Sequence, residues 1–275
     1  MPRLLISLGA RLVAATASVD RVYRLFDRLR SRTVLALGTD GFFDSYNDFC
    51  YGRTALYRAD SPAFRRSLFD WERAAISRFF PPPPARVLVG GVGGGREAFG
   101  LADLGYSVAA FDPSPRLVSS MLGALGPLRR VVEVFEGGFG NLPRLRSAGR
   151  AGEVTDLSAR ARFDAAVLGW ASFSHLRHDR DRVEALRGMA RLTCGPILVS
   201  YFGRMDDEAG SETESSATAR SRSGRHGPGA NFSVQVGFYR ALAQSEVRRV
   251  VAEAGLDVVA IDGSTEWPHA IVRKP

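Results

Sequence analysis

Five glycines fall between positions 90 and 95, and this is the pattern in the sequence that most directly suggests binding chemistry. They follow the apolar run Val87–Val89 and precede a segment with helical periodicity that starts near Gly95. Glycine has no Cβ and reaches positive φ, so a ligand can lie directly against the backbone N–H groups of such a turn. The start of the helix adds its partial positive charge at the same place. The pattern therefore predicts a turn that binds a ligand.

A carboxylate at the end of the next apolar run indicates what kind of ligand this is. Ser107–Phe111 has the composition of a second buried strand, and Asp112 and Pro113 follow it. In a unit of strand, glycine turn, helix and strand, an acidic side chain at this point can accept hydrogen bonds from both hydroxyls of a ribose. We therefore expect the ligand to contain a nucleoside.

The glycine spacing is compatible with two classes of nucleoside-binding protein. Gly93–Ala98 matches the dinucleotide-binding fingerprint, but this match leaves Gly90–Val92 as unexplained extra residues. The glycines at positions 91, 93 and 95 instead alternate directly after the strand. Taken together with Asp112, this alternation resembles the first motif of class I S-adenosylmethionine-dependent methyltransferases. One position departs from that family, because Val89 stands where an acidic residue usually holds the methionine amino group.

The resemblance implies an α/β fold, namely a Rossmann-like, doubly wound and mostly parallel seven-stranded sheet with an antiparallel C-terminal strand. It implies a cofactor-binding domain over residues 85–275 and a helical cap over residues 1–80. The composition of residues 204–229, which are rich in Ser, Gly, Glu and Arg, predicts a mobile loop within that domain. The expected strands are Val87–Val89, Ser107–Phe111, Arg130–Phe135, Phe163–Trp170 with its exit, Gly195–Phe202, Asp257–Ile261 and His269–Val272.

The cofactor that the resemblance implies is S-adenosyl-L-methionine, and the sequence contains no metal-ligand spacing. Three of the implied contacts have alternatives in the residues themselves. Arg96 pairs either with Glu97 or with the cofactor's carboxylate, since a cation is disfavoured in the first turn of a helix. Phe139 and Trp170 either contact the cofactor or belong to the core. The residues expected to bind the cofactor are Gly90, Gly91, Gly93, Gly95, Arg96, Asp112, Pro113, Phe139 and Trp170.

The loop Trp170–Leu176 follows the fourth expected strand and should face the same site, because ligands collect at the carboxyl ends of parallel strands. His175 is the side chain in this loop whose ordinary pKa suits general-base catalysis. A structural histidine is the competing interpretation. Methyl transfer from a sulfonium needs mainly alignment and exclusion of water, which agrees with the lack of an obvious catalytic constellation.

The first 80 residues have helical periodicity with breaks near Gly38–Gly41 and at Pro62. Between the helices, Tyr46–Arg53 mixes aromatic and polar side chains and suits either a lid over a ligand or a packed loop. The resemblance favours the lid, with Tyr46, Tyr51 and Arg53 facing the substrate. Leu4–Ala17 is apolar but interrupted by Arg11, which favours an amphipathic helix over a signal peptide.

The net charge of +8 comes almost entirely from arginine, since Lys274 is the only lysine. The arginines are scattered through the chain, so nucleic acid is a possible but not a favoured partner, apart from the local group between positions 21 and 32. No apolar run is long enough to span a bilayer. Cys50 and Cys194 suggest neither a disulfide framework nor a metal site, and we expect a cytoplasmic protein.

The sequence does not identify the methyl acceptor or the oligomeric state. The size of the N-terminal cap favours a small-molecule acceptor. An RNA methyltransferase is the alternative within the class. A nicotinamide-dependent oxidoreductase and a nucleotide-binding module without catalysis are the alternatives outside it, and the pairing of a last helix with two closing strands, one of them antiparallel, argues against a dinucleotide domain.

Overall fold

The computed structural model describes residues 2–148, 153–204, 226–263 and 267–275. Its centre is a nine-stranded sheet in the order β10-β11-β7-β6-β1-β2-β3-β4-β5. The parallel strands are β1 (Arg86–Gly90), β2 (Ser107–Asp112), β3 (Val132–Glu136), β6 (Ala165–Leu168) and β7 (Ile197–Ser200). The antiparallel C-terminal strand is confirmed: β11 (His269–Arg273) lies between β7 and β10 (Asp257–Asp262) and runs against both. The mobile loop expected at 204–229 falls mostly outside the described residues.

The expected number of seven strands is wrong, because two short strands extend the sheet beyond β3. They are β4 (Arg144–Ser147) and β5 (Val154–Asp156), and both pair antiparallel. This segment contains small residues and arginines, and no strand is expected in it from the sequence. Leu145 is the side chain that attaches it, since it is 1% exposed within the main core. One buried apolar residue in a polar stretch is too weak a periodic signal to predict a strand.

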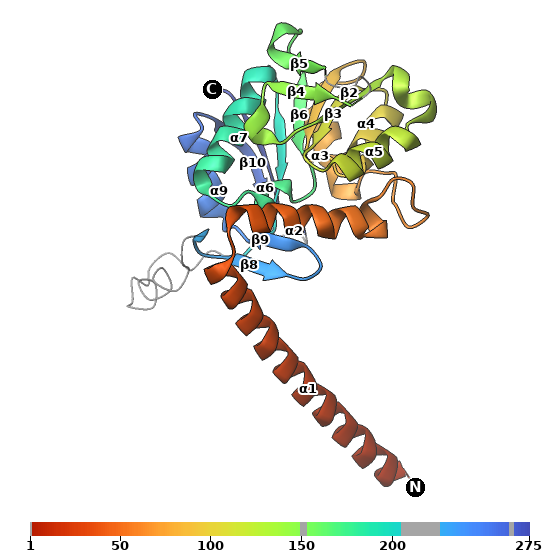
Figure 1. Ribbon diagram of the computed structural model, residues 1–275, viewed down its shortest axis with the longest axis vertical. Helices are drawn as coiled ribbons and strands as arrows, with labels where there is room; N and C mark the ends of the chain where they lie inside the picture. Colours follow the sequence, from red (N-terminus) through yellow and green to blue (C-terminus); the bar gives the residue numbers. More distant parts are fainter. Residues whose placement is uncertain (1, 149–152, 205–225, 264–266) are drawn as a thin grey trace.

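Helices cover both faces of the sheet, as Figure 1 shows. One face packs against α3 (Asp70–Phe79), α4 (Arg96–Asp103) and α5 (Pro115–Ala124), and the other against α7 (Asp179–Leu192) and α9 (Gln244–Glu253). Within β1, Val87 and Val89 face the first group and Leu88 faces the second, as the two-residue period of a strand requires. Short 3-10 turns complete the connections at Ala55–Tyr57 (η1), Gly126–Arg130 (η2), Phe139–Asn141 (η3) and Leu157–Ala159 (η4).

A cap lies along the edge of the sheet where the parallel strands end (Figure 1). It consists of the end of α1 (Pro2–Leu37), α2 (Asp40–Arg53) and a hairpin of β8 (Ala230–Ser233) and β9 (Gly237–Arg240). The break predicted near Gly38–Gly41 is confirmed, and Thr39 caps α2 by accepting a hydrogen bond from the N–H of Phe42. Phe43, Phe232 and Phe238 form a small core of their own between these elements.

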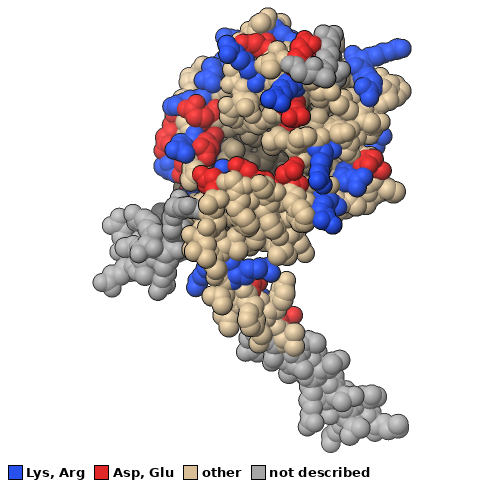
Figure 2. Space-filling view, viewed as in Figure 1, with Lys and Arg blue, Asp and Glu red and all other residues tan. Residues whose placement is uncertain are grey.

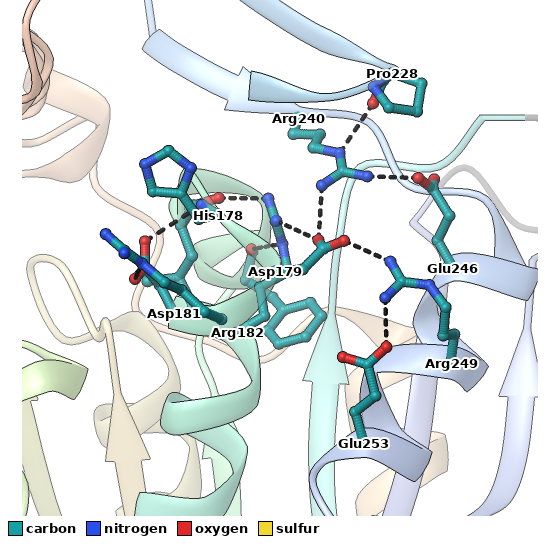
Figure 3. Close-up of polar contacts among 12 residues, drawn as sticks. His178, Asp179, Asp181, Arg182, Pro228, Arg240, Glu246, Arg249 and Glu253 are labelled. Carbon is teal, nitrogen blue, oxygen red and sulfur yellow. Dashed lines mark hydrogen bonds and ion pairs between the residues drawn. The ribbon is translucent and has the colours of Figure 1, made fainter. Parts of the chain in front are cut away.

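The β8–β9 hairpin is fixed to the body by a network of charged side chains (Figure 3). Arg240 on β9 is 4% exposed and donates hydrogen bonds to Asp179 at the start of α7 (2.6 Å) and to Glu246 on α9 (2.5 Å). Asp179 also accepts from the buried Arg182 (3.0 Å) and from Arg249. The hairpin, α7 and α9 are therefore joined through one carboxylate.

None of the helices in the described part of the chain is both long and apolar enough to cross a membrane.

Candidate active site

The glycine turn after β1 adopts the conformation that the alternating pattern predicts. Gly91, Gly93 and Gly95 have φ angles of +66°, +56° and +100°, which side chains with a Cβ rarely adopt. A Cβ on Gly93 would meet no atom within 4 Å, so this turn of backbone faces open space. A Cβ on Gly94 would lie 2.1 Å from the carbonyl oxygen of Tyr57, so the cap segment rests directly on the turn. The turn thus leaves room for a ligand at one glycine and is covered at the next.

Asp112 ends β2 beside this turn and is 7% exposed. Its Oδ2 accepts a hydrogen bond from the N–H of Gly93 (2.8 Å), and its Oδ1 accepts from the N–H of Ser114 (2.9 Å). A carboxylate can accept about four hydrogen bonds, so each oxygen keeps acceptor capacity for a ligand hydroxyl. Burial raises the pKa of Asp112 to about 6, against the opposing effect of the two N–H donors.

Arg96, in the first turn of α4, is buried and paired with carboxylates of the protein. Its Nη1 and Nη2 each donate to one oxygen of Glu72 on α3 at 2.6 Å, and Nη2 also donates to Glu97 at 2.8 Å. The predicted pairing with Glu97 is therefore confirmed, while the bidentate partner, Glu72, was not foreseen. Both terminal nitrogens of Arg96 are therefore engaged. Glu97 also accepts a hydrogen bond from the N–H of Trp170 (2.8 Å). Arg96 thereby fixes the glycine-turn helix against α3 and the loop after β6.

The structure brings together two predicted residues that lie far apart in the sequence. The hydroxyl of Tyr51 at the end of α2 lies 2.6 Å from Nε2 of His175, in the short helix α6 (Ser172–His175) after β6. Nδ1 of the same ring lies 2.7 Å from the carbonyl oxygen of Phe238. A carbonyl only accepts, so Nδ1 carries the proton and Nε2 accepts from the Tyr51 hydroxyl.

This pair is neutral over the physiological pH range. Burial lowers the pKa of His175 to about 4, although its hydrogen bond to the Phe238 carbonyl opposes the shift. Burial also raises the pKa of Tyr51 well above its ordinary value, and the nearby hydroxyl of Tyr57 and the charge of Asp112 add to that rise. Tyr51 is thus within electrostatic reach of the carboxylate beside the glycine turn.

Five aromatic rings form a wall that continues from Tyr51 along the same edge of the sheet. Successive ring centroids are 4.7 to 6.4 Å apart, and every one of these side chains remains partly exposed. The indole N–H of Trp170 is buried and has no hydrogen-bond partner among the described residues. An unpaired buried donor is a group that a ligand acceptor could satisfy. The wall consists of Tyr51, Tyr57, Phe69, Trp170 and Trp267.

Three further residues that were predicted to bind the cofactor, Phe139, Gly90 and Pro113, lie beside the glycine turn. Phe139 packs edge-on against Phe111 at 5.4 Å, and a Cβ on Gly90 would meet both of these rings. Pro113 is exposed beside Gly138. These residues therefore border the turn.

Two residues predicted for the lid lie away from the site. Tyr46 packs on Phe232 of the hairpin at 4.9 Å, and its hydroxyl donates to the carbonyl of Val234. Arg53 is exposed, with its guanidinium 4.8 Å above the ring of Phe49. A helix of 14 residues cannot direct all its side chains to one place, which is why only some of Tyr46–Arg53 reaches the site.

The surface is hollowed between α2 and the body, as Figure 2 shows, and acidic side chains lie along the rim on the α2 side. Asp48 of α2 crosses toward the body, because its Oδ1 accepts a hydrogen bond from the hydroxyl of Ser114 (2.5 Å). The hollow thus lies above the carboxyl ends of the strands, where a doubly wound sheet binds ligands.

Sequence reasoning missed several residues of this arrangement. Glu72, Tyr57 and Trp267 have no local signal, because each reaches the site from a distant part of the chain. Asp48 lies within the segment expected as a lid, and an acidic residue among the aromatic side chains was a signal that could have identified it. Ser114 has the sequence signal of a helix N-cap alone, and it caps α5 by accepting a hydrogen bond from the N–H of Leu117.

Comparison with known proteins supports one fold. No family model and no curated protein matches the sequence. Among solved structures, the chain is similar to the CcbJ methyltransferase from Streptomyces caelestis, with 17% identity and a TM-score of 0.54 over 83% of this chain and 99% of that one. It is also similar to magnesium protoporphyrin IX methyltransferase from Synechocystis PCC 6803, with 15% identity and a TM-score of 0.50 over 94% and 100% of the two chains.

The glycopeptide N-methyltransferase MtfA complexed with sinefungin gives a third match, with 19% identity and a TM-score of 0.50 over 80% and 90% of the two chains. The mostly parallel sheet, the antiparallel β11 and the glycine turn after β1 also agree with the fold that the sequence resemblance implies. The chain has the fold of the class I S-adenosylmethionine-dependent methyltransferases.

Proposed function

We propose that this protein transfers a methyl group from S-adenosylmethionine to a small-molecule acceptor. The observation that carries the proposal is the contact between Asp112 Oδ2 and the N–H of Gly93, which joins the end of β2 to the one glycine of the turn that faces open space. This contact places the Asp112 carboxylate, which can accept hydrogen bonds from ribose hydroxyls, beside the Gly93 backbone, which a ligand can approach. Three solved methyltransferases share the fold; the one from Synechocystis has S-adenosylhomocysteine bound, and MtfA is complexed with sinefungin.

The residues of the site suit this cofactor. Asp112 would hold the ribose, and Gly93 would lie against the cofactor. Phe139 borders the turn where the base would lie, and the indole N–H of Trp170 offers a free donor. Arg96 is engaged by Glu72 and acts in our proposal as a positioning residue rather than as a ligand of the cofactor's carboxylate. When bound, S-adenosylmethionine supplies a methyl group that is already activated by its sulfonium.

We assign the acceptor side of the site to Tyr51 and His175. Tyr51 would receive the acceptor's proton on its oxygen while its own proton moves to Nε2 of His175, which the Phe238 carbonyl holds in the required tautomer. An imidazole of low pKa is a weak base, so this transfer becomes favourable only as the acceptor gains the methyl group and becomes more acidic. The aromatic wall would exclude water and hold an apolar or planar acceptor. A cytoplasmic location remains part of the proposal.

The class of cofactor can be tested by thermal stabilisation. S-adenosylmethionine and S-adenosylhomocysteine should raise the melting temperature of the protein, because a ligand that binds only the folded state stabilises it by mass action. NAD and NADP serve as controls and should have no effect. Stabilisation by NAD or NADP alone would contradict the proposal. Retention of RNA that is lost on addition of salt would point to an RNA acceptor instead.

Replacing His175 by alanine, or Tyr51 by phenylalanine, should lower turnover about a hundredfold and leave cofactor affinity nearly unchanged. Either change removes the path for the acceptor's proton without touching the glycine turn. Turnover is measured as S-adenosylhomocysteine formed with the acceptor, and affinity by titration calorimetry. Tyr46→Phe is the matched control, since it removes a hydroxyl from the same helix at a place that faces the hairpin. Unaltered turnover in both variants would contradict the proposed proton transfer and would indicate that His175 is a structural residue.

Cofactor affinity should fall as the pH drops below about 6, because the ionised form of Asp112 accepts both ribose hydroxyls and the protonated form does not. Binding should be flat above that pH, and His175, with a pKa of about 4, should not contribute. Calorimetry from pH 5 to pH 8 measures this dependence. Asp112→Asn should bind weakly at every pH and lose the dependence, whereas His175→Ala should keep it. A parent protein with constant affinity over this range would contradict the assignment.

A further inference from the structure

Helix α1 carries apolar side chains that the body of the protein does not cover. Between 54% and 68% of each side chain is exposed at Val19, Val22, Tyr23, Leu25, Phe26 and Leu29. Among the side chains of α1 that the structure describes, those of the last turns attach it to the body: the buried Ser31 donates to Asn231 on β8 (2.7 Å), and Val34 and Leu35 pack on the small aromatic core. Figure 1 shows the rest of α1 pointing away from the body. An exposed apolar face of this size marks a contact surface.

The exposed apolar side chains and Arg24, Arg28 and Arg32 occupy opposite sides of this helix, whereas Arg30 lies on the apolar side and is paired with Asp27. At 100° per residue, the six apolar side chains cover an arc of about 160°, and Arg24, Arg28 and Arg32 lie outside it and are exposed. Basic side chains gather where α1 leaves the body (Figure 2). The 36 residues of α1 hold seven arginines and two aspartates, a formal charge of +5 within a chain of net charge +8. The preceding sequence, Leu4–Ala17, has one charged residue, Arg11.

The charge on the helix decides among the surfaces that could cover its apolar face. A second copy would place a helix of charge +5 beside another of charge +5, with two aspartates in each helix against seven arginines. The apolar arc is also wider than the narrow seam of a two-stranded coiled coil. RNA would satisfy the arginines and leave the apolar side chains in water. An anionic lipid surface satisfies both sides, because the acyl chains take the apolar face and the phosphate groups take the arginines.

We propose that α1 lies in the surface of a membrane that contains anionic lipids, with Val22 and Phe26 toward the acyl chains and Arg24, Arg28 and Arg32 at the phosphate groups. The helix lies along the interface rather than across it. The body of the protein is then connected to the membrane through the end of α1 that contacts β8. This inference concerns a surface outside the candidate active site and does not depend on methyl transfer.

Co-sedimentation of the full chain with unilamellar vesicles tests the proposal. The protein should bind phosphatidylcholine vesicles that contain phosphatidylglycerol, bind pure phosphatidylcholine much more weakly, and lose the difference at high salt. Changing Arg24, Arg28 and Arg32 together to glutamine should weaken binding about a hundredfold, at about fivefold for each arginine near an anionic surface. Phe26→Glu should weaken binding at least tenfold.

The matched control changes three exposed arginines of the sheet domain, Arg191, Arg248 and Arg273, to glutamine. This control has the same change in net charge and should bind vesicles like the parent. Circular dichroism checks that each variant is folded, which is expected because all the changes are on the surface.

Three results would overturn the proposal. Equal loss of binding in the control and in the Arg24, Arg28 and Arg32 variant would show attraction by net charge alone. A stable dimer that does not bind vesicles and that becomes monomeric on Phe26→Glu would show that a second copy covers the apolar face of α1. The third result is a protein that binds RNA but not vesicles, with an affinity for RNA that Phe26→Glu does not change. It would show that the arginines bind nucleic acid.

Discussion

Asp112→Ala is expected to weaken the binding of S-adenosylmethionine by about one to two orders of magnitude. Hydrogen bonds from the ribose hydroxyls to a carboxylate are worth roughly 1.5–3 kcal/mol, and the variant cannot accept them. The same change removes the acceptor of the Gly93 N–H, so the open glycine of the turn also loses its fixed position. Titration calorimetry with S-adenosylmethionine measures the effect.

The control is Asp103→Ala, which removes an exposed carboxylate from the end of α4 and should leave affinity unchanged. The Asp112 variant should still fold, and its melting temperature without ligand checks this. If Asp112→Ala binds the cofactor as tightly as the parent does, the ribose assignment fails and the proposed function loses its principal residue.

Arg96→Ala is expected to lower the free energy of unfolding by about 3–5 kcal/mol, the cost of leaving a buried charge without its partner. Glu72 and Glu97 are 2% and 3% exposed, and both accept hydrogen bonds from the Arg96 guanidinium, so the change leaves the two carboxyl groups facing each other across the space that the guanidinium leaves. Burial already raises the pKa of Glu72. Urea unfolding of the variant and the parent measures the difference.

Two comparisons separate this effect from a general loss of packing. Adding Glu72→Gln to Arg96→Ala should recover part of the stability, since one uncompensated charge is removed. The deficit of the single variant should also shrink as the pH falls, because burial raises the pKa of Glu72 and the folded state of the variant takes up a proton there. Arg73→Ala on the exposed side of α3 should change little. A loss below about 1 kcal/mol for Arg96→Ala would mean that the pair is not needed for the fold.

The parts of the fold that were predictable from sequence are those whose signal is local. The turn after β1 depends on glycines that need positive φ within five residues, and β2 with Asp112 follows within one helix of it. These residues fix one another through short segments of chain, so their pattern is visible without any knowledge of the rest of the molecule.

The rest of the site depends on contacts between distant residues. His175 meets Tyr51 across 124 positions, and Arg96 meets Glu72 across 24. Each partner has an ordinary local role as well, so neither residue type nor spacing selects the pair. The β8–β9 hairpin is not predicted from the sequence, because four-residue strands carry little periodic signal.

The shared carboxylate of Asp179 has a consequence for the rates at which parts of the protein open. The hairpin has few residues in the main core, and it would be expected to open separately from the sheet. Arg240 ties it to α7 and α9, however, and Phe238, two residues away on the same strand, holds the Nδ1 proton of His175. Opening of the hairpin must therefore break the two ion pairs of Arg240 and release the imidazole in one event. The amide protons of β9 and of α6 should accordingly exchange with solvent at a common rate, and that rate should rise in Asp179→Asn.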